Sequence, residues 1–189
     1  MVIVIVGILA TMTTDIITLP VKSYLDLERR TTLVDNAEMA LRRMQRDIRQ
    51  ALPNSIRILD SGNGIEFLHV AEGGRYRAKF MSDTSDPSYP GNILNFTDSS
   101  DNSFEVIGSL KNTPTPGNQL VIYNVGSSGA DAYEGTNRRT IANASTVDSV
   151  VFNLVSPVKP LPFKSPQQRF FIIDTPIAYR CVNDELRRY

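Results

Sequence analysis

The chain has 189 residues, and its 20 basic and 20 acidic side chains give a formal net charge of zero. This length is enough for one long helix and one compact domain. The balanced charge argues against a general nucleic-acid binder, because such proteins carry a basic excess. The chain has one cysteine, Cys181, and one histidine, His69, and it lacks the motifs of nucleotide-binding, serine-hydrolase and zinc-protease sites. We therefore expect a protein that is not an enzyme and that holds no metal or cofactor.

The first 52 residues predict one long helix with two parts. Residues 1–19 form the hydrophobic part, and its opening run MVIVIVGILATM contains no charged residue. At about 1.5 Å per residue this run spans roughly 18 Å, less than the roughly 30 Å of a bilayer core. The run has three alternative interpretations: a signal-peptide core, a buried core helix, or a membrane segment that has lost its beginning. The signal peptide is disfavoured, because a basic region and a cleavage site are missing. The side chains expected to meet a membrane or copies of the same segment are Val2, Ile3, Val4, Ile5, Val6, Ile8 and Leu9.

Residues 20–53 predict an amphipathic continuation of this helix. Pro20 lacks a backbone N–H, so we expect it to kink or break the helix and to divide the two parts. Beyond it, apolar residues recur with heptad-like spacing, which suits a helix that lies on a sheet or on another helix. The arginines between them form either a solvated face or a contact surface for neighbouring subunits or anionic lipid. Pro53 is expected to end the helix. The apolar stripe consists of Val34, Ala37, Leu41, Met44 and Ile48.

Residues 54–189 predict a β-rich domain, because the apolar period changes from about 3.6 to about 2 after Pro53. Residues 119–125 are expected to form a central strand, and Asn183-Asp184 the turn of the last hairpin. His69 is expected to be an ordinary strand residue. The loop with Asp98 and Asp101 lacks EF-hand spacing, which favours a solvated turn over a calcium site. The predicted strands are 55–59, 65–70, 75–80, 93–96, 104–107, 119–125, 138–142, 147–155, 169–174, 177–182 and 185–189.

The run MVIVIVGILA, a kinking proline, an amphipathic helix and a β-rich domain together resemble the type IV pilin and type II secretion pseudopilin superfamily. The segments QLVIYNV at 119–125 and SPQQRFFIIDTPIAYRC at 165–181 resemble minor pilins of the mannose-sensitive haemagglutinin (MSHA) pilus, of the MshO type. The resemblance implies an α+β fold in which a long N-terminal helix packs on an antiparallel sheet. Members of the superfamily carry a basic leader, a cleavage site and an FTLIEL-like segment before this run. We therefore expect Met1 to be an internal residue of the family's segment.

The resemblance also implies a structural role rather than catalysis. The chain would be a single-pass inner-membrane protein with a periplasmic head at 54–189, and it would enter a pilus through its N-terminal helix. Its partners would be other pilins or pseudopilins, the inner membrane and the pilus assembly platform. The resemblance further suggests that Cys181 forms a disulfide with a cysteine outside this sequence. A type II secretion pseudopilin, and a pilus-associated adhesin that binds through loops 81–92 and 126–135, are the alternatives.

Overall fold

The computed structural model describes residues 2–87, 89–155 and 159–189, except for the side chains of residues 8–19 and residue 60. The chain divides into two compact units, a helical unit that extends to Arg46 and a head unit, Asp47–Tyr189. One long helix and an antiparallel sheet make up the regular structure. The expected α+β class is therefore confirmed.

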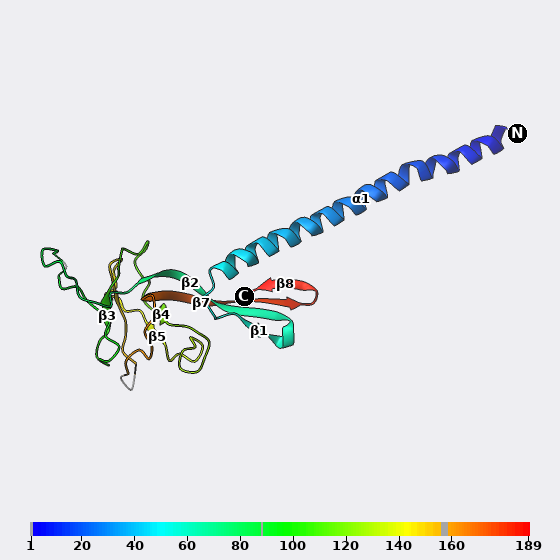
Figure 1. Ribbon diagram of the computed structural model, residues 1–189. Coiled ribbons are helices and arrows are strands. Elements are labelled where there is room, and N and C mark those ends of the chain that lie inside the picture. Colours follow the sequence, from blue (N-terminus) through cyan, green and yellow to red (C-terminus); the bar gives the residue numbers. More distant parts are fainter. Residues whose placement is uncertain (1, 88, 156–158) are drawn as a thin grey trace. The chain divides into compact units, whose positions relative to one another are not determined.

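Within the described residues, the main sheet of the head has six strands (Figure 1). Their order is β1-β2-β7-β4-β5, with β8 also paired to β7, and every pairing is antiparallel. A second, two-stranded sheet joins β3 and β6. The strand predicted at 119–125 is confirmed for its first four residues, which form β4 between β7 and β5. The strands are β1 (Arg57–Leu59), β2 (Gly64–Arg75), β3 (Ser103–Glu105), β4 (Gln119–Ile122), β5 (Arg138–Thr140), β6 (Ser149–Val151), β7 (Arg169–Val182) and β8 (Glu185–Arg188), and a short 3-10 helix, η1 (Asp60–Gly62), joins β1 to β2.

Strands β2 and β7 each continue through a position where the sequence predicts an interruption. The break predicted between the strands 65–70 and 75–80 is wrong, because Gly73 pairs with Phe171 and Gly74 with Phe170 of β7. The break predicted near Pro176 is also wrong. Among the described residues, only β2 pairs with β7 there, since β4 pairs with residues 170–173 and β8 with residues 179–182. A proline is tolerated on an unpaired strand edge, because no ladder hydrogen bond is lost there.

Gly74 is required by the close approach of β2 to an aromatic side chain. A Cβ atom at this position would lie 3.0 Å from Cζ of Phe170 and 3.2 Å from Cδ2 of Leu110. We expect Gly74→Ala to lower the free energy of unfolding of the head by about 1–3 kcal/mol, because both neighbours are buried and cannot move freely. Urea denaturation measures this loss. Gly73→Ala is the matched control, with its nearest contact at 3.3 Å, and equal losses for both variants would contradict the explanation.

The last hairpin forms as predicted, and the short strand predicted at 93–96 does not. Asn183 and Asp184 both have positive φ, 51° and 63°, as the favoured two-residue hairpin turn requires. Residues 93–96 are irregular. The Asp101 carboxylate accepts a hydrogen bond from the Asn95 N–H at 2.6 Å, which takes a donor that a strand ladder would use.

Helix α1 (Val2–Arg49) continues through Pro20. Of the two alternatives predicted at Pro20, the break is therefore wrong, whereas the kink and the boundary between the two parts stay predictions. A proline costs a helix one N–H donor, here the one that would reach the Ile16 carbonyl, but the turns on either side keep their own hydrogen bonds.

The helix ends at Arg49, earlier than the end predicted at Pro53. The N–H of Leu52 donates to the Leu68 carbonyl at 2.8 Å, and the N–H of Val70 donates to the Gln50 carbonyl at 2.8 Å. The backbone groups of Gln50 and Leu52, which another turn of helix would need, are therefore hydrogen-bonded to strand β2. This pairing is long-range, so the local sequence does not reveal it.

The head has two hydrophobic clusters. The larger one surrounds Phe104 and Phe170, whose ring centroids lie 5.0 Å apart. The smaller one contains Leu52, which is fully buried and follows the end of the helix directly. The chain thus passes from helix α1 straight into the packed interior of the head.

Candidate interaction surface

The first turn and a half of helix α1 exposes apolar side chains on all sides. Val2 is 75% exposed, Ile3 88% and Ile5 58%, and Val4 and Val6 are similar. Five consecutive residues point around the full circumference of a helix, so no single face of this segment is polar. Ile8 and Leu9 belong to the same helix, but their side chains lie outside the described residues. Among the described residues, no helix is both long and apolar enough to span a membrane.

Exposed apolar side chains continue along the helix beyond Pro20. Of the predicted stripe, Val34, Ala37 and Leu41 are exposed, whereas Met44 and Ile48 are half-buried. Packing of this stripe on a sheet or another helix stays a prediction. The other large apolar side chains exposed between Pro20 and Arg42 are Val21, Tyr24, Leu25, Leu27, Leu33 and Met39.

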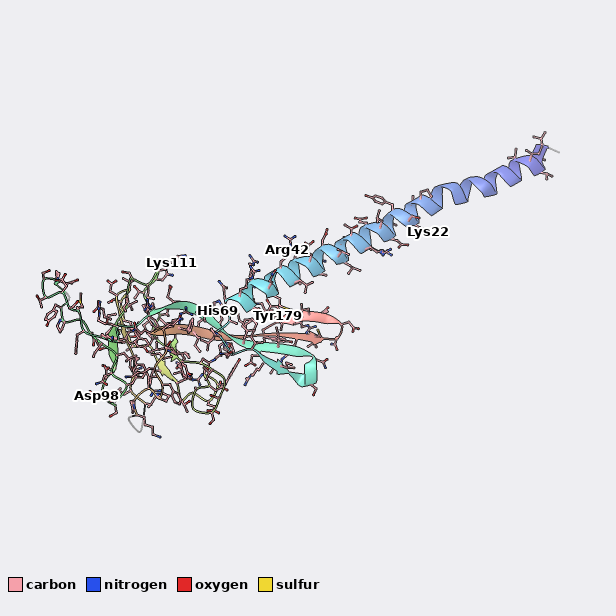
Figure 2. All side chains as sticks on the ribbon, in the orientation of Figure 1. Lys22, Arg42, His69, Asp98, Lys111 and Tyr179 are labelled. Atoms are coloured by element: carbon pink, nitrogen blue, oxygen red, sulfur yellow. The ribbon has the colours of Figure 1, made fainter. Side chains whose placement is uncertain are left out.

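The charged side chains of α1 are also exposed, and few of them are paired. Arg29 forms an ion pair with Asp26 at 3.7 Å, and Arg42 forms one with Glu38. Figure 2 shows Lys22 and Arg42 extending from the helix. Exposed pairs of this kind contribute only about 0.2–0.5 kcal/mol each. Within the described part of the chain, Arg30, Arg43 and Arg46 form no ion pair, so these charges remain available to a partner.

Asp47, the first residue of the head unit, fixes the end of α1 to the sheet. Its Oδ2 atom accepts hydrogen bonds from the Tyr179 hydroxyl on β7 and from Nε of Arg188 on β8, both at 2.7 Å. Burial, followed by the bond to Asp47, raises the pKa of Tyr179. The residues after the helix are held as well, since Nδ2 of Asn124 donates to the Pro53 carbonyl at 2.7 Å and Nδ2 of Asn54 donates to the Asn124 carbonyl at 3.0 Å.

Tyr133 holds residues that follow the junction. Its hydroxyl donates to the Ser55 carbonyl at 3.0 Å, and the Arg57 guanidinium lies 3.8 Å from the centre of its ring. Arg57 is itself paired with Glu66 at 2.6 Å. Burial raises the pKa of Tyr133 to about 12, with a further rise from Glu66 that Arg57 opposes.

The raised pKa of Tyr133 makes the stability of the head depend on pH in the alkaline range. The neutral hydroxyl is the form that the fold favours, so its contribution is complete below the ordinary tyrosine pKa of about 10 and is lost as pH rises through about 12. We expect the free energy of unfolding to fall less steeply between these values in Tyr133→Phe than in the unmodified chain. Urea denaturation at a series of pH values measures both slopes. Equal slopes would show that Tyr133 does not titrate with unfolding.

Arg139 is a buried charge without an acidic partner in the described part of the chain. The residue is 3% exposed. Nη1 donates to the carbonyls of Thr136 and Arg138, and Nη2 donates to those of Lys159 and Pro160, at 2.7–3.1 Å. Burial lowers its pKa. The guanidinium thus ties strand β5 to residues 159 and 160.

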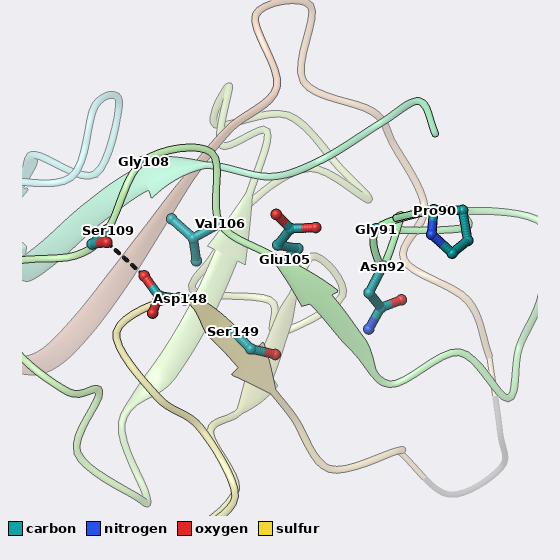
Figure 3. Close-up of a pocket in the computed structure, with 9 residues that line it drawn as sticks. All are labelled: Pro90, Gly91, Asn92, Glu105, Val106, Gly108, Ser109, Asp148 and Ser149. Carbon is teal, nitrogen blue, oxygen red and sulfur yellow. Dashed lines mark hydrogen bonds between the residues drawn. The ribbon is translucent and has the colours of Figure 1, made fainter. Parts of the chain in front are cut away.

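The two loops predicted as adhesin loops each contribute to a hollow on the head. Pro90, Gly91 and Asn92 line an open hollow of about 700 Å³ (Figure 3). Its two carboxylates are engaged, because Glu105 binds Arg77 at 2.7 Å and Asp148 accepts a hydrogen bond from the Ser109 hydroxyl. The second hollow, of about 440 Å³, is lined by Gly129, Glu134, Gly135, Thr136, Arg139, Val155, Lys159, Pro160, Pro162 and Phe163.

The residues considered for metal or disulfide chemistry are Asp98, Asp101, His69 and Cys181. Asp98 accepts hydrogen bonds from Ser100, and Asp101 accepts one from the Asn95 N–H. His69 is a residue of β2, and its Nδ1 lies 2.8 Å from Oδ1 of Asp174. Cys181 is exposed and carries a free thiol. Within the described residues, no three His, Cys, Asp or Glu side chains are grouped to hold a metal ion.

Asp47 and Arg139 are the important residues that the sequence pattern does not identify. Both belong to runs of charged residues that are typical of solvated surfaces. The only local signal is the position of Arg139 inside a predicted strand, where alternate residues face the interior.

Comparison of the chain with protein-family models, with curated proteins and with solved structures finds no match.

Proposed function

We propose that this chain is a structural subunit of the type IV pilin and pseudopilin class, and that it acts as a minor pilin-like component. The observation that carries the proposal is helix α1, 48 residues long, whose first residues are apolar and exposed on every side. The β-rich head that follows it agrees with the resemblance described above. The mechanism is assembly: the helix is held in the inner membrane and then packs against equivalent helices in a filament.

The free energy available from burial of the first residues supports this mechanism. Full burial of one valine or isoleucine side chain contributes about 1.5–3 kcal/mol. The five residues Val2–Val6 are 58–88% exposed, so about 5–10 kcal/mol of burial is left unused in the isolated chain. A bilayer or a bundle of like helices would supply the missing apolar surroundings.

The junction at Asp47 suits a subunit whose helix must carry a head. Its two hydrogen bonds reach β7 and β8, and the buried Leu52 follows within two turns. A head fixed in this way moves with the last turn of its helix. In the proposed function, the helix provides assembly and the head forms the outer part of the subunit.

The same helix would serve a type II secretion pseudopilin, which assembles in the periplasm instead of at the cell surface. Deletion of the gene separates these two proposals. A minor pilin of an MSHA-like pilus is required for surface filaments, whereas a pseudopilin is required for export of secreted proteins.

Ligand binding by the head is a second candidate function, favoured by the two hollows that loops 81–92 and 126–135 help to form. It differs from assembly in one respect that can be measured, because binding by the head does not need the apolar end of α1.

The experiment for the main proposal is the replacement of Ile3 and Ile5 by aspartate in the full-length protein. Loss of both membrane retention and filament incorporation is the expected result.

A further inference from the structure

The buried guanidinium of Arg139 belongs to the wall of a hollow in the head. This hollow of about 440 Å³ is lined by Arg139, Lys159 and Phe163 among others, and we call it the Arg139 hollow. Nη1 and Nη2 of Arg139 donate to four carbonyls, but its Nε–H donates to none of the described residues. Burial lowers the pKa of Arg139, and no carboxylate counteracts this effect. A negative charge beside this guanidinium would therefore offset the cost of burying it.

The other charged side chains of the hollow leave its positive charge in excess. Lys159 is exposed and forms no ion pair with the described residues. Glu134 is engaged, because its Oε2 atom accepts a hydrogen bond from the Gly129 N–H at 2.9 Å. With two basic side chains and one acidic side chain, the lining has a formal charge of +1. The hollow is thus suited to a ligand with one negative charge.

An apolar wall adjoins these charges. It is formed by Val155, Pro160, Pro162 and Phe163. The Phe163 side chain is 44% exposed, and its ring centroid lies 5.8 Å from that of Tyr123, which supports it from within the head. A concave apolar wall with a few polar groups is typical of sites for small ligands. The ligand that matches both parts of the hollow has an apolar group next to its negative charge.

We propose that the Arg139 hollow binds a carboxylate attached to an apolar group, with Arg139 and Lys159 compensating the carboxylate and Phe163 contacting the apolar group. A carboxylate suits the hollow better than a phosphate, because its single charge matches the formal charge of the lining and Glu134 repels a second negative charge. This site goes beyond assembly. It rests on the second candidate function, ligand binding by the head, and gives it a class of ligand.

A titration with 3-phenylpropionate tests the site in the full chain, labelled with ¹⁵N and held in detergent micelles. The amide signals of Gly135 and Thr136, which line the hollow, are expected to shift as the acid is added. The uncharged 3-phenylpropanamide has the same apolar group and should bind at least about 10-fold more weakly, because hydrogen bonds to a charged group are the stronger ones. Equal shifts with the acid and the amide, or no shifts with either, overturn the proposal.

Three exposed residues of the hollow can be changed without touching the buried Arg139. Lys159→Gln is expected to weaken binding of the acid about 2- to 5-fold, and Glu134→Gln to strengthen it by a similar factor, because both charges are partly screened by water. Phe163→Ser should weaken binding about 3- to 10-fold through loss of apolar contact. Lys111→Gln is the matched control, since this exposed lysine does not line the hollow. Equal losses in Lys159→Gln and Lys111→Gln would contradict a site at the Arg139 hollow.

A chain terminus and a free acid both present a carboxylate beside an apolar group. An N-acetylated tripeptide that ends in phenylalanine, with a free or an amidated C-terminus, distinguishes these sources. Tighter binding of the free-terminus peptide than of 3-phenylpropionate identifies a chain terminus, and weaker binding identifies a free acid. Both results require loss of binding on amidation, and binding that survives amidation overturns the proposal.

The site and the proposed functions can fail separately. Shifts confined to Gly91 and Asn92, which line the other hollow, would show that the head binds a ligand but not at the Arg139 hollow. Ile3→Asp with Ile5→Asp should bind 3-phenylpropionate as the unmodified chain does, because these residues are remote in sequence from the head. If this variant assembles normally, the assembly function is wrong and the carboxylate site stands.

Discussion

Replacement of Arg139 by methionine is expected to lower the free energy of unfolding of the head by about 2–4 kcal/mol. The methionine fills much of the same volume but donates no hydrogen bonds. The carbonyls of Thr136, Arg138, Lys159 and Pro160 then lose a charged donor, and buried carbonyls without a partner cost about 1–3 kcal/mol each when water cannot replace the donor. Removal of the buried charge offsets part of this loss, because a guanidinium without an acidic partner is itself costly to bury.

Two further variants separate the hydrogen bonds of Arg139 from its charge. Arg139→Lys keeps the charge but lacks the planar fork of donors, so it should recover only part of the lost stability. Arg138→Met removes the neighbouring arginine, which is only partly buried, and should cost less than about 1 kcal/mol. Urea denaturation followed by circular dichroism measures all three variants. Full stability in Arg139→Met would show that the four carbonyls do not need this donor.

Local patterns in the sequence predict the parts of the fold that depend on interactions between residues close in the sequence. The apolar run and the stripe beyond it predict a long helix, and Asn183-Asp184 predicts the last hairpin, because both residues tolerate positive φ. The bulky residues at 119–125 predict a central strand. In each of these places the local preference and the tertiary structure agree.

The predictions that fail concern places where contacts with a segment far away in the chain determine the local structure. Gly73-Gly74 is a turn signal in isolation, but the rings of Phe170 and Phe171 occupy the space that side chains there would need. Pro176 is tolerated because the two neighbours of β7 pair on either side of it. The helix ends early because β2 takes the backbone groups of residues 50–52. Pairings of this kind join residues far apart in the chain, and they cannot be predicted from local patterns in a single sequence.

The candidate interaction surface could be predicted in part. The apolar residues Val2–Val6 are evident from composition alone, and the structure adds that they are exposed. The anchoring of the helix by Asp47 could not be predicted, because its partners Tyr179 and Arg188 lie at the other end of the chain. For the same reason, the hydrogen bonds of Arg139 could not be predicted, because two of the carbonyls that accept them belong to residues 159 and 160, about 20 residues after Arg139.

The exchange of Ile3 and Ile5 for aspartate has the largest expected effect on function. An aspartate costs up to about 2.5–3.5 kcal/mol in a membrane-embedded helix, so the pair costs up to about 5–7 kcal/mol. In a bundle of helices the penalty is at least as large, because each charge would be buried without a partner. The head should fold normally, since its hydrophobic clusters contain no residue of this segment.

The matched control places the same charges elsewhere on the helix. Asn36 and Gln45 are exposed polar residues of α1, and their replacement by aspartate adds two negative charges without touching the apolar residues. This variant should be retained in the membrane nearly as well as the unmodified protein. It separates the effect of burial from that of net charge.

The most direct measurement of assembly through helix α1 is the distribution of the full-length protein in its own host. The amount in the membrane fraction and the amount in sheared surface filaments are determined for the unmodified protein, for Ile3→Asp with Ile5→Asp, and for Asn36→Asp with Gln45→Asp. We predict that the first variant is reduced at least 10-fold in both fractions, and that the control is close to the unmodified protein. Unchanged membrane retention and unchanged incorporation of the Ile3 and Ile5 variant would contradict assembly through this helix.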